Sequence, residues 1–150
     1  MRLRLARLGV VAGVAALALG VQSAPAATGH LSGGGTASIS QVAMNVTFGA
    51  SGTASGSFNC LMAGRSSFVL GDFGLAHIMK VQATPTNGSV TGSIASFSGP
   101  GFVIMDGGQR MNIDVSVWVN IATQQFQLTV AQLGPPLPVE TFASGGVRLR

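Results

Sequence analysis

Charged side chains are scarce in this 150-residue sequence. They make up 8% of it, whereas a typical soluble domain carries about 25%. The sequence also contains no Tyr, one Trp, one Cys and two His residues. A coiled coil or a long helical bundle is excluded, because those folds are rich in Glu, Lys and Arg. Intrinsic disorder is excluded as well, because 47% of the residues are hydrophobic.

Few residues could serve as metal ligands or catalytic bases. Cys60, His30 and His77 are isolated from one another, whereas a zinc site needs several such ligands at close spacing. The many serines include no G-x-S-x-G motif of a serine hydrolase. Cys60 cannot form an intramolecular disulfide. Its phase with Phe58 and Met62 predicts a buried thiol, and a disulfide between two chains is the alternative.

The first 26 residues contain the three parts of a secretory signal peptide. Arginines at positions 2, 4 and 7 precede an apolar run from Leu8 to Val21, and Ala24-Pro25-Ala26 fits an A-x-A cleavage site. The run is shorter than the roughly 20 residues of a membrane span. We therefore predict a helical, cleaved signal peptide at 1–26 and a single domain at 27–150. The mature chain is expected to be secreted, periplasmic or extracellular, with no membrane span.

Removal of this signal peptide would leave the chain almost neutral. The whole sequence carries eight basic and four acidic residues, and three of the basic residues lie in the signal. The mature chain would keep five basic residues against four acidic ones, a net charge of +1. Five scattered cations cannot form the basic surface that nucleic-acid binding needs, so a nucleic-acid partner is excluded.

From about Gly29 onward, apolar residues recur at every second position, most clearly between Met111 and Val119. This period is typical of half-buried antiparallel strands. We expect a long loop at 63–75 and an extended, proline-rich connector at 134–138. The expected strands span 30–39, 42–49, 53–62, 76–84, 89–97, 101–105, 110–120, 124–132 and 143–149.

Turn signals separate these strands at hairpin distances. The strongest is Asn87-Gly88, a pair favoured in type I′ turns, and another is Ser98-Gly99-Pro100-Gly101. Successive hairpins predict an all-β antiparallel meander of about eight or nine strands. Pairing of the last strand with the first would form a closed or nearly closed small barrel and cover both edges. A two-sheet β-sandwich is the alternative.

Several glycine- and serine-rich segments resemble one family of modules. They are Gly33-Gly34-Gly35, Val46-Thr47-Phe48-Gly49, Ala54-Ser55-Gly56-Ser57-Phe58-Asn59, Gly88-Ser89-Val90-Thr91-Gly92-Ser93-Ile94 and Met105-Asp106-Gly107-Gly108. On these segments most of the mature chain resembles the secreted bacterial modules called post-COAP domains. The resemblance implies an extracellular β-module of undefined ligand, with Asp106 and Asp114 at two aspartate positions of the family pattern.

Asp106 and Asp114 are the one pair of carboxylates to which the sequence points. Asp106 lies in a glycine-rich turn, and Asp114 lies on the strand that follows. Oxygen ligands of this kind make the pair a weak candidate for calcium, with turn capping and a solvated strand face as the alternatives. The same pair would serve a secreted, glycosidase-like hydrolase, which is our alternative function. No cofactor is expected.

Trp118 lies on the polar phase of its strand, beside Asn120, and the next strand presents Gln125 and Gln127. An exposed aromatic side chain among amides suits a sugar ring or a protein partner. A tryptophan half-buried under the segment 134–141 is the alternative. The function that we predict is that of an exported, non-enzymatic and monomeric β-module. It would bind an unknown carbohydrate or protein, or serve a structural role, outside the cytoplasm.

Overall fold

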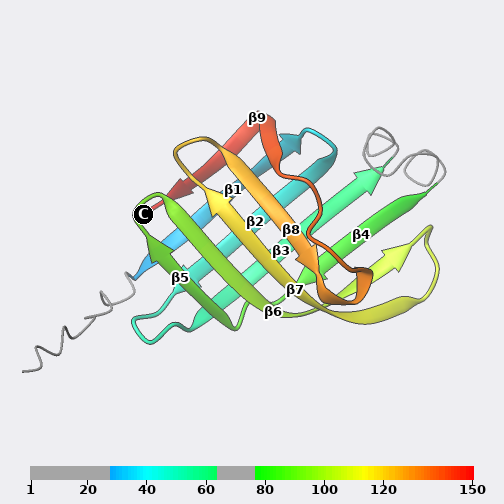
Figure 1. The fold of residues 1–150 in the computed structure, drawn as a ribbon, viewed down its shortest axis with the longest axis horizontal. Helices are drawn as coiled ribbons and strands as arrows, with labels where there is room; N and C mark the ends of the chain where they lie inside the picture. Colours follow the sequence, from blue (N-terminus) through cyan, green and yellow to red (C-terminus); the bar gives the residue numbers. More distant parts are fainter. Residues whose placement is uncertain (1–27, 64–76) are drawn as a thin grey trace, which may run out of the picture.

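The computed structural model describes residues 28–63 and 77–150, which form one nine-stranded antiparallel sheet (Figure 1). The all-β class is thereby confirmed. The predicted signal peptide at 1–26 and nearly all of the predicted loop at 63–75 lie outside the described residues. The elements are β1 Gly29–Ala37, β2 Ser40–Phe48, β3 Ala54–Ala63, β4 Ile78–Ala83, β5 Asn87–Thr91, β6 Ile94–Met105, β7 Arg110–Asn120, β8 Gln125–Val130, the 3-10 turn η1 Ala131–Leu133, and β9 Glu140–Leu149.

The strands pair mainly with their neighbours in the chain, and the last strand meets the first. β1 pairs with β2 on one side and with β9 on the other, as the sequence predicts. β4 also pairs with β6, so that eight strands form a ring. β5 is the ninth strand and pairs with β6 next to β4. All nine strands belong to a single sheet, rather than to the two sheets of the alternative.

The hairpin between β5 and β6 differs from the prediction. β5 begins at Asn87, and its two-residue turn consists of Gly92 and Ser93, so the predicted turn at Asn87-Gly88 is wrong. Gly92 has a φ of +58°, and glycine is favoured as the first central residue of a type II′ turn. The backbone at Gly88 is used for pairing instead, since its N–H donates to the carbonyl of Gly52 at 2.9 Å.

The sequence predicted a turn at Ser98-Gly99-Pro100-Gly101, but β6 continues through these residues as one strand, so this predicted turn is wrong. It pairs with β5 along its first half and with β4 along its second half. Pro100 lies at the break between the two. Its carbonyl accepts a hydrogen bond from the Thr84 N–H at 2.9 Å, so the proline nitrogen points to the same side. Proline has no backbone N–H to donate. At Pro100 this costs no ladder hydrogen bond, because the pairing of β6 changes there from β5 to β4.

The side chains that point into the ring form one hydrophobic core. The rings of Phe58 and Phe97 meet edge to face, with centroids 5.8 Å apart. The predicted alternation on β7 is confirmed from Ile113 to Val119, whose inward side chains are buried. Met111, predicted for the same face, is instead 50% exposed, because it lies at the very start of β7, at the end of the ring.

Glycines let β1 and β9 approach closely. Gly33 has a φ of +152°, and a Cβ atom added to it would lie 2.1 Å from the carbonyl oxygen of Gly146. No side chain fits at that distance, so glycine is required at position 33, where β1 runs against the backbone of β9. The predicted closure of the first strand on the last depends on this contact.

Candidate functional site

Trp118 lies on the outer face of the ring, where β6, β7 and β8 run side by side. It is opposite Ser96 of β6 and Gln127 of β8. Its neighbours Val117 and Val119 point into the core, so the period of two directs the indole outward. The side chain is half-buried rather than fully exposed.

Trp118 contributes to a groove of about 500 Å³ on this outer face. The polar side chains of the groove are hydroxyls and amides, which can both donate and accept hydrogen bonds. They come from four strands and include Asn87, Ser89, Ser96, Ser98, Ser116, Gln127 and Thr129. The site thus combines one large aromatic ring with a rim of neutral polar groups.

Of the four residues predicted to bind a ligand, two line this groove and two do not. Trp118 and Gln127 are part of it. The amide of Asn120 instead accepts hydrogen bonds from the N–H groups of Ala122 and Thr123, at 3.1 and 3.2 Å. Gln125 bonds to two threonine hydroxyls. Both amides therefore belong to the β7–β8 turn and its flank, because the strands end there.

The segment 134–139 contacts Gln127, one of the residues that line the Trp118 groove. The Gln127 side chain donates to the carbonyl of Leu137 at 2.9 Å, and the Leu137 N–H donates to the carbonyl of Leu128 at the same distance. The proline-rich connector forms no strand, as predicted, and runs beside β8. Gln127 is fixed in orientation by this contact, which leaves its amide oxygen available to the groove.

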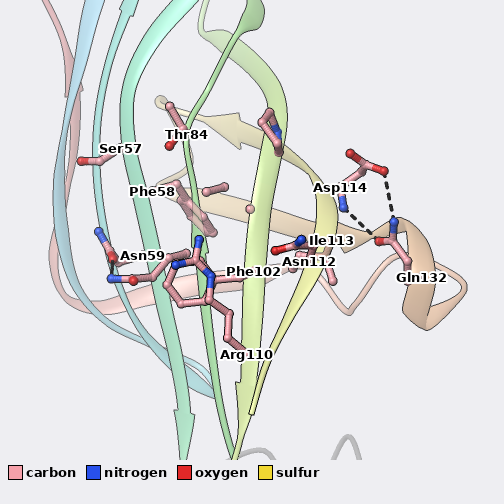
Figure 2. A pocket seen from close by; sticks show the side chains of 14 residues that line it. Ser57, Phe58, Asn59, Thr84, Phe102, Arg110, Asn112, Ile113, Asp114 and Gln132 are labelled. Carbon is pink, nitrogen blue, oxygen red and sulfur yellow. Dashed lines mark hydrogen bonds between the residues drawn. The ribbon is translucent and has the colours of Figure 1, made fainter.

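A second groove, of about 680 Å³, lies on the outer face across β3, β4, β6 and β7. Figure 2 shows the guanidinium of Arg110 over the ring of Phe102, and its carbon lies 3.6 Å from the ring centroid. The Gln82 amide donates to Asn59 on the neighbouring strand. The sequence alone does not predict this groove, because Phe102 and Arg110 come from two strands whose register the sequence does not reveal.

Asp114 lines the second groove, whereas Asp106 lies elsewhere. Asp114 is opposite Pro100 on β6, and Asp106 follows the far end of that strand, about 20 Å away at the usual rise per residue. Two carboxylates of a glycosidase lie about 5–9.5 Å apart. The structure therefore does not bring Asp106 and Asp114 together, either for hydrolysis or for calcium. Among the described residues, no three acidic, His or Cys side chains form a group that could hold a metal ion.

Asp106 stabilises a turn. Its carboxylate accepts a hydrogen bond from the Ile78 N–H at 2.7 Å and pairs with the His77 ring. The Ile78 hydrogen bond, and then His77, lower the pKa of Asp106 below its ordinary value of 3.8. Its φ of +53° is a conformation that Asp tolerates better than most residues. Asp114 bonds to Gln132 through both its N–H and its carboxylate, at 2.9 and 3.1 Å.

A buried polar cluster at the start of β9 was also not predicted from the sequence. Glu140 is 2% exposed, and one of its carboxylate oxygens accepts hydrogen bonds from the N–H groups of Ile39 and Ser40, both at 3.0 Å. The Ser40 hydroxyl lies 2.9 Å from both carboxylate oxygens. Burial raises the pKa of Glu140 despite these donors. Glu140 and Phe142 occupy alternate positions of one strand and therefore share a face. This spacing is the sequence signal that could have indicated a buried Glu140.

Cys60 lies buried beside this cluster and is a free thiol. Burial raises its pKa to about 12, and the nearby Glu140 carboxylate adds to the shift. The thiolate is the reactive form, so this environment makes the thiol unreactive. Buried packing, one of the two roles considered for Cys60, matches this position.

Comparison with known proteins finds no match to a family model, to a curated protein or to a solved structure. The resemblance to post-COAP domains thus stays a prediction. In the described part of the chain, no helix has the length and hydropathy needed to cross a membrane.

Proposed function

We propose that this chain is an exported, non-enzymatic binding module and that the Trp118 groove binds carbohydrate. The observation that carries the proposal is the half-buried indole of Trp118 among serine and threonine hydroxyls and the Gln127 amide. A sugar ring has an apolar C–H face and a rim of hydroxyls. The indole would pack against that face, and the polar rim of the groove would bond to the hydroxyls.

The scaffold supports this role. The groove residues come mainly from β6, β7 and β8, which are joined by continuous ladders, so their outer side chains are held in fixed positions. We infer that the eight-stranded ring is a small closed barrel. Besides the two β8–β9 pairs, the Phe142 N–H donates to the carbonyl of Gln124, just before β8, and the Leu137 N–H donates to the carbonyl of Leu128. A preorganised site binds more tightly, because less conformational entropy is lost on binding.

Other parts of the proposal come from the sequence. The arginines, apolar run and A-x-A site of residues 1–26 support export, with the mature monomer acting outside the cytoplasm. A non-enzymatic role is favoured because Asp106 and Asp114, the candidate catalytic carboxylates, lie too far apart. The resemblance to post-COAP domains agrees with a secreted β-module.

Fluorescence of Trp118, the one tryptophan of the sequence, tests the proposal. We expect partial quenching by acrylamide in the free protein and protection when a soluble plant or bacterial polysaccharide is added. Trp118→Ala should weaken binding about ten-fold or more, since a central aromatic contact contributes about 2 kcal/mol. The binding of the variant is measured by calorimetry.

Leu133→Ala is a matched control, because Leu133 is a large apolar side chain that is 51% exposed and lies outside the groove. It should leave polysaccharide binding unchanged. No binding of any polysaccharide, or equal loss in the two variants, would contradict the proposed function.

A further inference from the structure

The two grooves belong to one continuous stripe along β6 and β7. The outward residues of β7 run from Trp118 through Ser116, Asp114 and Asn112 to Arg110. Trp118 lines the first groove and Arg110 lines the second, and each outward residue faces an outward residue of β6. Trp118 and Arg110 are eight positions apart, which is about 26 Å along an extended strand. That length suits several units of a linear polymer rather than one small molecule.

The far end of this stripe is positively charged. Arg110 is opposite Ile104 on β6, and Ile104 is opposite Lys80 on β4. The positions of the two cations are therefore two strands apart, about 10 Å. Lys80 and Arg110 are both exposed and point to the outer face.

Neither cation has a carboxylate partner in the part of the chain that the structure describes. The ion pair found there joins His77 and Asp106, at a turn. The guanidinium of Arg110 rests on Phe102, which fixes its orientation and leaves its N–H groups free to bind an anion. An ordered guanidinium matches the geometry of a carboxylate, since two parallel N–H···O bonds can form.

One carboxylate lies within the stripe, and a second, Asp106, lies just beyond its Arg110 end, where it accepts the Ile78 N–H and pairs with His77. Asp114 is midway between Trp118 and Arg110, and its side chain accepts a hydrogen bond from Gln132. It disfavours an anion in the middle of the stripe. An anionic group of a ligand is therefore directed to the end formed by Arg110 and Lys80, while the Trp118 end is lined by neutral groups.

We propose that the ligand is a linear acidic polysaccharide whose chain lies along β6 and β7, with a sugar ring on Trp118 and a sugar carboxylate on Arg110 and Lys80. This inference depends on the proposed function, since it names the class of carbohydrate. The positive charges of Arg110 in the second groove and of Lys80 two strands away, the length of the stripe and the neutral rim around Trp118 each support it.

The test compares two polymers with the same backbone. Polygalacturonate carries a carboxylate on every sugar, and its fully methyl-esterified form carries none. We expect the full chain, as exported, to bind polygalacturonate about ten-fold more tightly at low salt, with the difference shrinking as salt is added. In the double variant Lys80→Gln/Arg110→Gln, the preference for polygalacturonate should disappear while binding of the ester is kept.

Arg148→Gln is the matched control. Arg148 is also exposed, but it lies on β9 opposite Ser32, away from the stripe. It should keep the preference for polygalacturonate, and thermal unfolding of all variants checks that each is folded.

The outcomes separate the two proposals. Equal binding of both polymers, or equal loss in Arg148→Gln, would overturn the acidic ligand while leaving the carbohydrate function intact. Binding of neither polymer would overturn the inference, and absence of binding across neutral polysaccharides as well would overturn the function. Equally tight binding of poly-glutamate, independent of Trp118, would overturn the inference in favour of an acidic polypeptide.

Discussion

The side chain of Gln124 pairs with the backbone of Val147 as a neighbouring strand would. Its amide oxygen accepts the Val147 N–H at 2.8 Å, and its amide nitrogen lies 3.0 Å from the Val147 carbonyl. β8 begins at Gln125, so no strand residue of β8 reaches this part of β9. Gly146 makes room, because a Cβ atom there would lie 2.4 Å from the amide oxygen.

We expect Gln124→Ala to lower the free energy of unfolding by about 1–3 kcal/mol. Three backbone groups, the N–H and carbonyl of Val147 and the carbonyl of Ile121, lose a partly buried hydrogen bond. Urea denaturation measures the change. Gln125→Ala is the control, since its side-chain hydrogen bonds are exposed, and it should cost less than about 0.5 kcal/mol. Equal losses of stability in the two variants would show that the Val147 contact contributes no more than an exposed side-chain hydrogen bond.

The buried carboxyl of Glu140 should make stability depend on pH above 4.5. Its folded pKa is raised by burial, so between its ordinary pKa of 4.5 and the folded value the native state binds more protons than the unfolded state. The contribution of Glu140 to stability is complete below pH 4.5 and is lost as the pH rises through the folded pKa. Glu140→Gln, which does not ionise, should flatten the denaturation profile over this window.

The control for Glu140 is Asp114→Asn, which changes an exposed carboxylate on β7. Its profile above pH 4.5 should keep the slope of the parent protein. A parent profile that is already flat there, or a Glu140→Gln profile with an unchanged slope, would count against a raised pKa in the folded protein.

Asp106 should make the free energy of unfolding fall as the pH decreases. This dependence is opposite in sign to that of Glu140 and occurs at lower pH. Its pKa is lowered by the Ile78 hydrogen bond and by His77, so its contribution is present above pH 3.8 and is lost as the pH falls through the lowered value. Asp106→Asn keeps a side chain that tolerates positive φ and can accept the Ile78 hydrogen bond. We expect this variant to unfold less steeply in acid, as followed by circular dichroism, and an unchanged acid limb would refute the effect.

The Cys60 thiol should resist modification until the protein unfolds. Burial raises its pKa to about 12, so little thiolate is present at neutral pH. We expect no reaction with a thiol reagent at pH 8 in native buffer and full reaction of one thiol per chain in denaturant. Fast labelling of the native protein, or a dimer that disappears on reduction, would contradict the buried, unpaired state.

The alternation of apolar and polar residues predicted those parts of the fold that depend only on residues close together in the sequence. The alternation of β7 was evident because its core-facing residues from Ile113 to Val119 are apolar and its outer residues are polar, apart from Trp118. The turn at Asn87-Gly88 was wrong, since Asn-Gly favours a turn only where both strands can pair across it. The turn forms instead at Gly92-Ser93, and β5 and β6 pair directly up to the residues that flank it, Thr91 and Ile94.

The candidate site was less accessible from the sequence, because it depends on which residues face each other across strands. Trp118 and Gln127 are opposite partners on β7 and β8, and the phase of each strand was sufficient to bring them together. Lys80 and Arg110 are related through Ile104 on a third strand, so two registers had to be known. Glu140 and Ser40 are 100 residues apart in the chain, and only closure of the ring places them in contact.

The two ends of the described domain are neighbours, since His30 and Arg150 exchange backbone hydrogen bonds of 2.8 and 3.0 Å. β1 and β9 are antiparallel and meet at these ends (Figure 1). A pulling force applied to residues 29 and 150 would therefore open this ladder one pair at a time from its end, like a zipper, instead of shearing all of it at once. We expect the domain to yield at low force in single-molecule stretching. It should resist far more when pulled from residue 29 of β1 and residue 140 of β9, which lie at opposite ends of the ladder and load all of it in shear.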